Sequence, residues 1–274
     1  MPNPMTIPAY EPMLAAYHRA FAIELRSMIH SLPLTRGQHV LDMACGDGVY
    51  GPWLAERVGP DGRVVGVDLV PDYLELARSE AERSAAGGII DFAAASIDAL
   101  PFAKETFEFC WCAESLYSLP DPLEAVRRLA DVTKSGGYVA VLESDTIHHV
   151  ILPWPVEIEL SVRAAELQSL VDRKESHRKF YVGRELRRIF TDAGLVEFVQ
   201  RSFAIDSLGP FEEDERTFFA EYLKSLDEQI RDYLDPAILD DFDRLVDPDS
   251  DSYLLDDPDI TATCIDHIVW GRKR

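Results

Sequence analysis

The 274-residue chain has little of what marks secreted or membrane-spanning proteins. Its four cysteines, Cys45, Cys110, Cys112 and Cys264, are too few and too widely placed for a disulfide framework in a chain of this size. It shows no long uninterrupted apolar run and no basic-then-apolar leader. We therefore expect a cytoplasmic protein with reduced thiols and no membrane insertion.

Basic residues are also scarce, with 27 Lys and Arg against 49 Asp and Glu and a net charge of -22. Nucleic-acid binding needs clustered positive charge, so this balance favours a small-molecule partner over a polyanion. Between Asp206 and Asp259 we count 19 acids and four bases. Such a segment is typical of a solvated helical surface, and a second interpretation is a lid that disfavours anionic substrates.

One stretch organises the rest of the chain, residues 39–58, HVLDMACGDGVYGPWLAERV. Apolar residues lead to Asp42, small residues follow, and helix-forming residues resume at Trp53. The pattern predicts a buried strand, a glycine turn and a helix. Glycine lets a ligand approach the backbone closely, and a helix start attracts negatively polarised groups. We expect the turn to bind part of a nucleotide-like cofactor.

The residues of this turn are compatible with two cofactors. Gly46 to Gly51 matches G-x-G-x-x-G, a pattern of dinucleotide-binding proteins. Asp42 argues against a pyrophosphate there, because its carboxylate repels phosphate but accepts hydrogen bonds from an ammonium group such as that of S-adenosylmethionine (SAM). Asp68 ends the next strand, at the position from which a carboxylate reaches ribose hydroxyls of either cofactor.

Further strands and helices alternate along the chain, which predicts an α/β fold. We expect strands at residues 63–69, 89–94, 107–112, 134–144, 196–205 and 263–270. Helices are expected at residues 13–29, 71–86, 156–173 and 183–193, with two more in 211–242 that are split at Asp235-Pro236. Cys110 and Cys112 share one face of a strand, but no His or Cys at ligand spacing lies nearby, so we predict no metal.

Four segments together resemble the class I SAM-dependent methyltransferases, in particular the small-molecule, UbiE-like group. They are DMACGDG, ASIDALPF, LYSLPDP and KSGGYVAVLES, and the resemblance is continuous from about residue 36 to 145. It implies a Rossmann-like, seven-stranded, mostly parallel sheet with an antiparallel last strand, helices on both faces and helical lid insertions.

The resemblance also implies the cofactor site, with SAM as the cofactor. Asp42, Ala44, Gly46 and Gly48 would surround the methionine moiety. Asp68 would bind the ribose and Leu69 would pack against the adenine. Ser96 and Ile97 would contact the adenine, with Ser96 in place of the family's usual Asp. Cys112 would face the SAM amino group through its backbone carbonyl. Ala44 replaces the first glycine of the family motif.

The resemblance further implies methyl transfer to a small organic acceptor, with oxygen or carbon favoured over nitrogen. A base is optional; our candidates are His148 and then Tyr117, while His149 and Glu114 are alternatives. Tyr17 and His18 could close over the site, although aromatic residues on such a helix face more often pack in a core. The alternatives are a non-catalytic SAM-binding protein and an NAD(P)-dependent oxidoreductase.

We expect one methyltransferase domain over residues 1–274, as a monomer or homodimer. Residues 1–35 would form an N-terminal arm and helix, and residues 36–145 the SAM-binding core. Residues 146–182 would form a cap insertion and 208–261 a helical acidic insertion. Residues 183–207 and 262–274 would complete the core.

Overall fold

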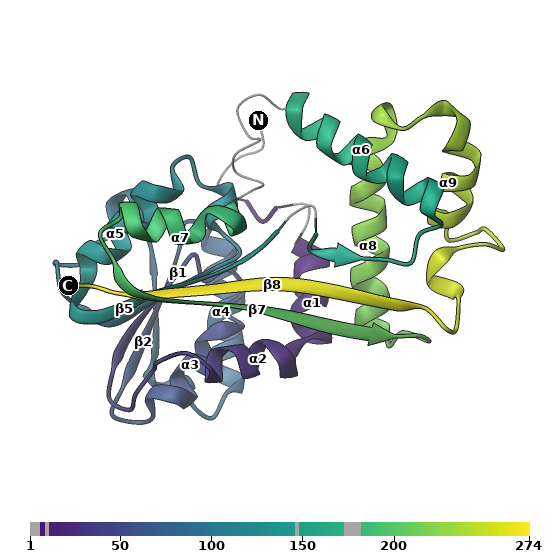
Figure 1. The fold of residues 1–274 in the computed structure, drawn as a ribbon. Helices are drawn as coiled ribbons and strands as arrows, with labels where there is room; N and C mark the ends of the chain where they lie inside the picture. Colours follow the sequence, from purple (N-terminus) through teal and green to yellow (C-terminus); the bar gives the residue numbers. More distant parts are fainter. Residues whose placement is uncertain (1–5, 9–10, 146–147, 173–181) are drawn as a thin grey trace.

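The computed structural model describes residues 6–8, 11–145, 148–172 and 182–274, and Figure 1 shows its fold. Part of the expected N-terminal arm and part of the expected cap insertion lie outside these residues. The described strands are β1 (His39–Met43), β2 (Arg63–Asp68), β3 (Ile90–Ala94), β4 (Phe107–Ala113), β5 (Thr133–Ser144), β6 (Val150–Ile151), β7 (Val196–Leu208) and β8 (Thr261–Arg272). The α-helices are α1 (Glu11–Ala20), α2 (Ala22–His30), α3 (Tyr50–Val58), α4 (Pro71–Arg83), α5 (Pro122–Val132), α6 (Val156–Asp172), α7 (Val182–Asp192), α8 (Glu213–Ile230) and α9 (Leu239–Val246).

The strands form one mixed sheet in the order β3-β2-β1-β4-β5-β8-β6, and β7 also pairs with β8. Strands β1 to β5 are parallel, whereas β8 runs antiparallel to β5, β6 and β7. This confirms the Rossmann-like fold and its antiparallel last strand. The two-residue strand β6 and helix α5 were not predicted. Because the five parallel strands point the same way, their carboxyl ends meet at one edge of the sheet.

Helices cover both faces of the sheet, and alternation along the strands explains how. On β4, Phe109 and Trp111 belong to a hydrophobic cluster that includes residues of α1, α2 and α3. Cys110 and Cys112 belong to a second cluster, which includes residues of α5 and α7. Successive side chains of a strand point to opposite faces, so one strand supplies both layers.

The N-terminal segment forms two helices, so the prediction of one helix over residues 13–29 is wrong. Phe21 separates α1 from α2 with φ -108° and ψ 23°, outside helical geometry. Its ring is buried and lies 5.0 Å from the ring of Tyr17 and 5.8 Å from that of Phe218, measured between centroids. Helical periodicity continues across residue 21, but tertiary packing of Phe21 accompanies the break.

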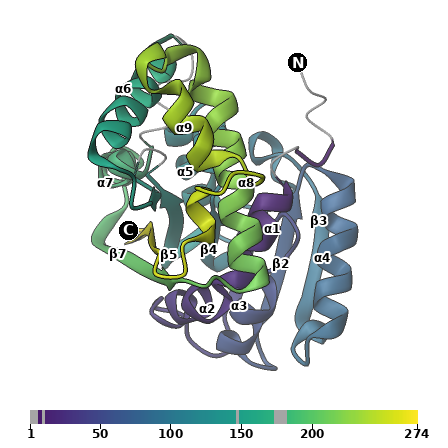
Figure 2. The same cartoon turned by 90° about the vertical axis from the view of Figure 1, so that its right-hand side faces the viewer.

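Strands β7 and β8 extend from the sheet to a group of helices made of α6, α8 and α9 (Figure 1). Seen from the side, α8 lies next to α1 (Figure 2). Trp154 stacks on Phe242 at 5.9 Å, and both belong to the same hydrophobic cluster as Phe109. Because one cluster includes residues of both regions, we propose that residues 1–274 form a single domain with the boundaries given above. No helix in the described ranges is long and apolar enough to span a membrane.

Candidate functional site

The glycine turn follows β1 and lies at the carboxyl edge of the parallel strands. Ala44, Gly46 and Gly48 have positive φ values of 55°, 51° and 82°. A Cβ atom on Gly48 would lie 2.6 Å from the Cβ of Ala77 on α4, so glycine there permits close packing of the turn against α4. A Cβ on Gly46 would meet no atom within 4 Å. The two glycines therefore differ, since of the two only Gly46 has open space next to its Cα.

The third glycine of the dinucleotide pattern, Gly51, is not in a tight position. A Cβ on Gly51 would lie 3.8 Å from side-chain atoms of Ile90, which is ordinary van der Waals contact. In dinucleotide-binding folds this glycine permits close packing of helix against strand. The local packing therefore gives the literal G-x-G-x-x-G match little support.

Asp42 is a buried residue of β1, just before this turn. It is 2% exposed, and no residue in the described part of the chain donates a hydrogen bond to its side chain. Burial, and then the charges of Asp68 and Asp47, raise the pKa of Asp42 to about 8. A cation next to Asp42 would stabilise its ionised form, and SAM carries two positive groups, a sulfonium and an ammonium.

Asp68 stands at the end of β2, close to the turn. Its carboxylate accepts hydrogen bonds from the backbone N–H groups of Gly46 and Val70, both at 2.9 Å. Burial raises the pKa of Asp68, and these backbone bonds oppose the rise. The carboxylate thus links β2 to the glycine turn and keeps lone pairs for further donors, such as hydroxyl groups.

The remaining expected cofactor residues lie on the neighbouring loops. Leu69 is 43% exposed directly after Asp68. The Ala95 N–H donates to the Asp68 carbonyl at 3.1 Å, which ties the loop after β3 to the end of β2. In that loop, the Ser96 hydroxyl accepts from the Asp98 N–H at 3.2 Å and caps a short helical turn that contains the buried Ile97.

Cys112 lies near the end of β4, opposite Met43 of β1 in the parallel pairing. Its thiol is buried among apolar side chains, and burial raises its pKa well above the usual value. The thiol is therefore protonated and unsuited to nucleophilic chemistry. The role that the resemblance implies for Cys112 concerns its backbone carbonyl and does not need the thiol.

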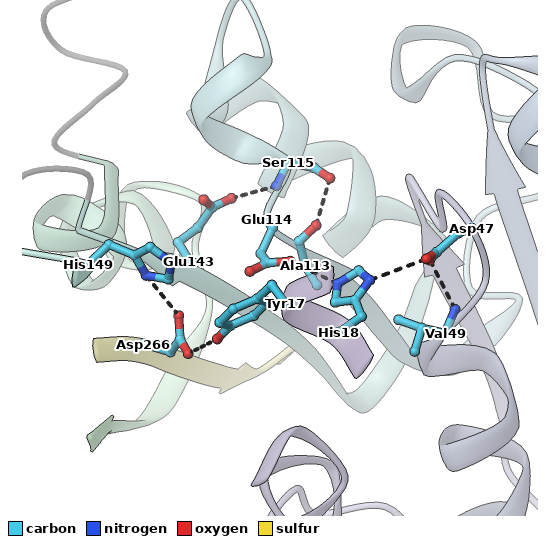
Figure 3. A network of polar contacts seen from close by, with 10 residues as sticks. All are labelled: Tyr17, His18, Asp47, Val49, Ala113, Glu114, Ser115, Glu143, His149 and Asp266. Carbon is cyan, nitrogen blue, oxygen red and sulfur yellow. Dashed lines mark hydrogen bonds and ion pairs between the residues drawn. The ribbon is translucent and has the colours of Figure 1, made fainter. Parts of the chain in front are cut away.

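His18 of α1 reaches into the same site. It is 5% exposed, with Nδ1 3.3 Å from Asp47 of the glycine turn and Nε2 3.2 Å from Glu114 after β4 (Figure 3). Burial lowers the pKa of His18, but the hydrogen bonds and charges of the two acids outweigh it and raise the pKa to about 10. The resulting imidazolium joins α1 to the ends of two strands.

Glu143 of β5 accepts hydrogen bonds from the backbone of the loop that follows β4. Its side chain is 1% exposed and accepts from the N–H groups of Ser115 at 3.0 Å and Leu116 at 2.5 Å. Burial raises the pKa of Glu143 to about 8, although these bonds lower it. Glu114 itself has a φ of 48°, an unusual value for a non-glycine residue. Glu143 therefore helps to fix the loop that presents Glu114.

The two sequence-based candidates for a base, His148 and Tyr117, lie in different surroundings. His148 is on the surface, with a side chain 55% exposed, and its Nδ1 lies 3.5 Å from Asp145 and 2.7 Å from Arg184. Tyr117 packs against the cluster on the α5 and α7 face of the sheet. Neither is among the residues labelled in Figure 3, which shows the contacts of His18, Glu114 and Asp47.

Sequence reasoning missed Asp266 as a site residue. Asp266 is fully buried on β8, where the Tyr17 hydroxyl donates to Oδ2 and His149 Nδ1 lies 3.6 Å from Oδ1. A signal was present, because Cys264, Asp266 and Ile268 alternate on one side of a strand and a lone acid among apolar neighbours is costly to bury. Tyr17 and His18, for which core packing was the commoner of two interpretations, are buried and also make polar contacts with Asp266, Asp47 and Glu114.

Comparison with known proteins adds the following. Residues 41–141 match a family model described as a methyltransferase domain. A demethylmenaquinone methyltransferase from Lactococcus lactis subsp. lactis is 30% identical over 170 residues, which cover 58% of this chain and 66% of that protein. The methyltransferase GfsG from Streptomyces halstedii is 29% identical over 142 residues, which cover 52% and 48%. The chain thus spans less than two thirds of either protein.

The fold has solved counterparts. A SAM-dependent methyltransferase from Aquifex aeolicus superposes with a TM-score of 0.51 and 19% sequence identity, covering 69% of this chain and 90% of that one. At this level of identity the likeness concerns the arrangement of helices and strands.

Proposed function

We propose that the chain is a class I SAM-dependent methyltransferase and that it transfers a methyl group from SAM to a small organic acceptor. The observation that carries this proposal is the buried Asp42 carboxyl group beside a glycine turn, with the acids Asp47 and Asp68 near it. This is a setting for a cationic cofactor. A dinucleotide, which brings a negatively charged pyrophosphate, would meet repulsion there.

The cofactor would be held by the residues that the family resemblance assigns. Asp42 would stabilise the positive end of the methionine moiety, with the backbone of Ala44, Gly46 and Gly48 around it. The Cys112 carbonyl would accept from the amino group. Asp68 would bind the ribose, and Leu69, Ser96 and Ile97 would surround the adenine. The exposed Leu69 and the open space at Gly46 fit these roles.

SAM supplies an already activated methyl group, so the chain has mainly to orient the acceptor and exclude water. Positioning alone contributes about 7 to 11 kcal/mol in favourable cases. We favour oxygen or carbon over nitrogen as the acceptor atom. Glu114 and Asp266 would hold an amine in its protonated form, because a nearby negative charge raises an amine's pKa and removes its nucleophilic lone pair. His148 and Tyr117 are the bases that the sequence proposes.

Native mass spectrometry of the purified full chain tests this proposal. The protein incubated with SAM and, separately, with NAD should retain SAM or its product S-adenosylhomocysteine and should not retain NAD. Retained NAD would support the oxidoreductase alternative. Retained SAM without methyl transfer to any component of a metabolite extract would support the non-catalytic alternative.

A further inference from the structure

Asp266 has one carboxylate oxygen that lacks a protein donor. Oδ2 accepts from the Tyr17 hydroxyl, but Oδ1 is fully buried and accepts no hydrogen bond from any described residue. Burial raises the pKa of Asp266 to about 6, while the nearby His149 opposes the rise. The group is therefore largely ionised at neutral pH. A buried, ionised oxygen without a donor calls for an explanation, because such groups are costly.

His149 is a nearby group that can donate a proton toward Asp266 Oδ1. Its Nδ1 lies 3.6 Å from Asp266 Oδ1 and 3.4 Å from the Ile265 carbonyl oxygen. Since both neighbours of Nδ1 are acceptors, the neutral ring carries its proton on Nδ1. Nε2 then keeps its lone pair, and no hydrogen bond joins Nε2 to a residue in the described ranges. The side chain is 17% exposed, so the ring is reachable from outside the core.

The backbone holds His149 in this place. The Ile265 N–H donates to the His149 carbonyl at 2.8 Å. The next residue, Val150, begins β6 and pairs with Cys264 of β8. The unpredicted short strand thus holds the residue next to His149 against β8, beside Asp266.

Tyr17 connects this pair to the cofactor side of the site. Its ring lies 5.5 Å from the ring of His149, and Figure 3 shows Tyr17 and His149 approaching Asp266 from different sides. The next residue on α1, His18, contacts Asp47 and Glu114. The two sets of polar contacts therefore start from consecutive residues of α1, one toward the glycine turn and the other toward His149.

We propose that His149 is the catalytic residue that takes a proton from the acceptor, and that Asp266 and Tyr17 are positioning residues for it. This rests on the proposed methyl transfer. As the acceptor oxygen's lone pair forms a bond to the methyl carbon, the carbon–sulfur bond breaks and its electron pair stays on sulfur. The hydroxyl proton moves to His149 Nε2 and later to solvent. Asp266 balances the charge of the imidazolium.

The surroundings of His149 define the class of acceptor. The negative groups Asp266 and Glu114 disfavour an anionic acceptor, while the protonated His18 is already paired with two acids. The ring of Phe218 lies 6.2 Å from His149 and that of Tyr17 borders it on another side. Both rings belong to the buried core beside His149, so it is the charges of Asp266 and Glu114 that favour a neutral, hydroxyl-bearing acceptor.

Histidine NMR tests the proposal in the full chain. Long-range proton–nitrogen spectra of the ¹⁵N-labelled protein should show ring signals from its seven histidines. The signals that are lost in His149→Gln identify those of His149. At a pH where the ring is neutral, we expect the Nδ1–H tautomer. Asp266→Asn should raise the fraction of the Nε2–H tautomer above that of the wild type, because it removes the negative charge that favours Nδ1–H and leaves the Ile265 carbonyl as the remaining acceptor. The neighbouring variant His148→Gln should leave the His149 signals unchanged.

A probe of the hydroxyl class completes this test. With S-adenosylhomocysteine bound, phenol should shift the His149 Nε2 resonance, and anisole, its methyl ether, should shift it far less. An Nε2–H tautomer in the wild type, an unchanged tautomer in Asp266→Asn, or equal responses to both probes would overturn the proposal. Calorimetric titration with S-adenosylhomocysteine separates the two levels: absent binding contradicts the proposed function, whereas normal binding with the wrong tautomer contradicts only the role of His149.

Discussion

Cofactor binding should release a proton from Asp42. With a pKa of about 8, this carboxyl group is about nine-tenths protonated at pH 7 before the cofactor binds. The positive groups of SAM favour the ionised form, so binding must expel the proton. The expected release is about 0.9 proton at pH 7, falling to about 0.1 at pH 9. Below pH 8, the affinity for SAM should accordingly increase by up to about tenfold for each unit by which the pH is raised.

Calorimetric titration of SAM in phosphate and in Tris at pH 7 measures this release. The two buffers differ in ionisation enthalpy, so the difference in binding heat gives the number of protons transferred. Asp42→Asn has no proton to lose and serves as the control, and it should bind SAM more weakly with no dependence on the buffer. Equal heats in both buffers for the wild type would refute the assignment of Asp42 as a buried acid that meets the cofactor's positive charge.

Other predictions concern neighbouring residues. Asp68→Ala should weaken SAM binding by about 1 to 3 kcal/mol in calorimetry, because it removes charge-assisted bonds to ribose; an unchanged affinity would remove Asp68 from the site. Ser96→Asp should tighten or preserve binding, and a loss beyond about tenfold would show that this segment is misaligned with the family. Gly48→Ala should lower stability in urea unfolding by more than Gly46→Ala, since both have positive φ but only Gly48 would clash with Ala77; equal effects would contradict the packing argument. The Asp42 carboxyl binds a proton in the folded state between pH 3.8 and about 8 but not in the unfolded state, so its contribution to stability falls as pH rises through this range; Asp42→Asn should therefore raise Tm more at pH 8 than at pH 5.

Most of the sheet could be predicted from local patterns, because every strand except β6 is long enough to carry its own signal. Apolar runs such as Val64 to Val67 end in Asp68 and are followed by a proline that opens a helix, and the structure places β2 and α4 there. The prediction failed at Phe21, where the helical pattern is unbroken and only packing against Tyr17 and Phe218 accompanies the change. The strand β6 has two residues, too short for any periodicity to be seen.

The candidate site was only partly predictable, because sequence patterns carry local information and some of its contacts are long-range. Asp42 and Asp68 are marked by their positions at strand ends, which is local information. The contacts of Tyr17 with Asp266 and of His18 with Glu114 join residues separated by 249 and 96 positions. No local pattern encodes such pairs, because they arise when α1 packs across the sheet edge. Asp266 and Glu114 were therefore visible as residues but not as partners of α1.

Transfer of a methyl group from SAM to a small neutral molecule can be followed directly. The most direct measurement incubates the purified full chain with SAM labelled in its methyl group and a metabolite extract, and then follows the label by chromatography. The account predicts label in a small organic product, formed together with S-adenosylhomocysteine, and a strong loss of that product with Asp42→Asn at limiting SAM. Bound SAM whose label never leaves the cofactor, or label that appears equally with the wild type and the variant, would contradict it.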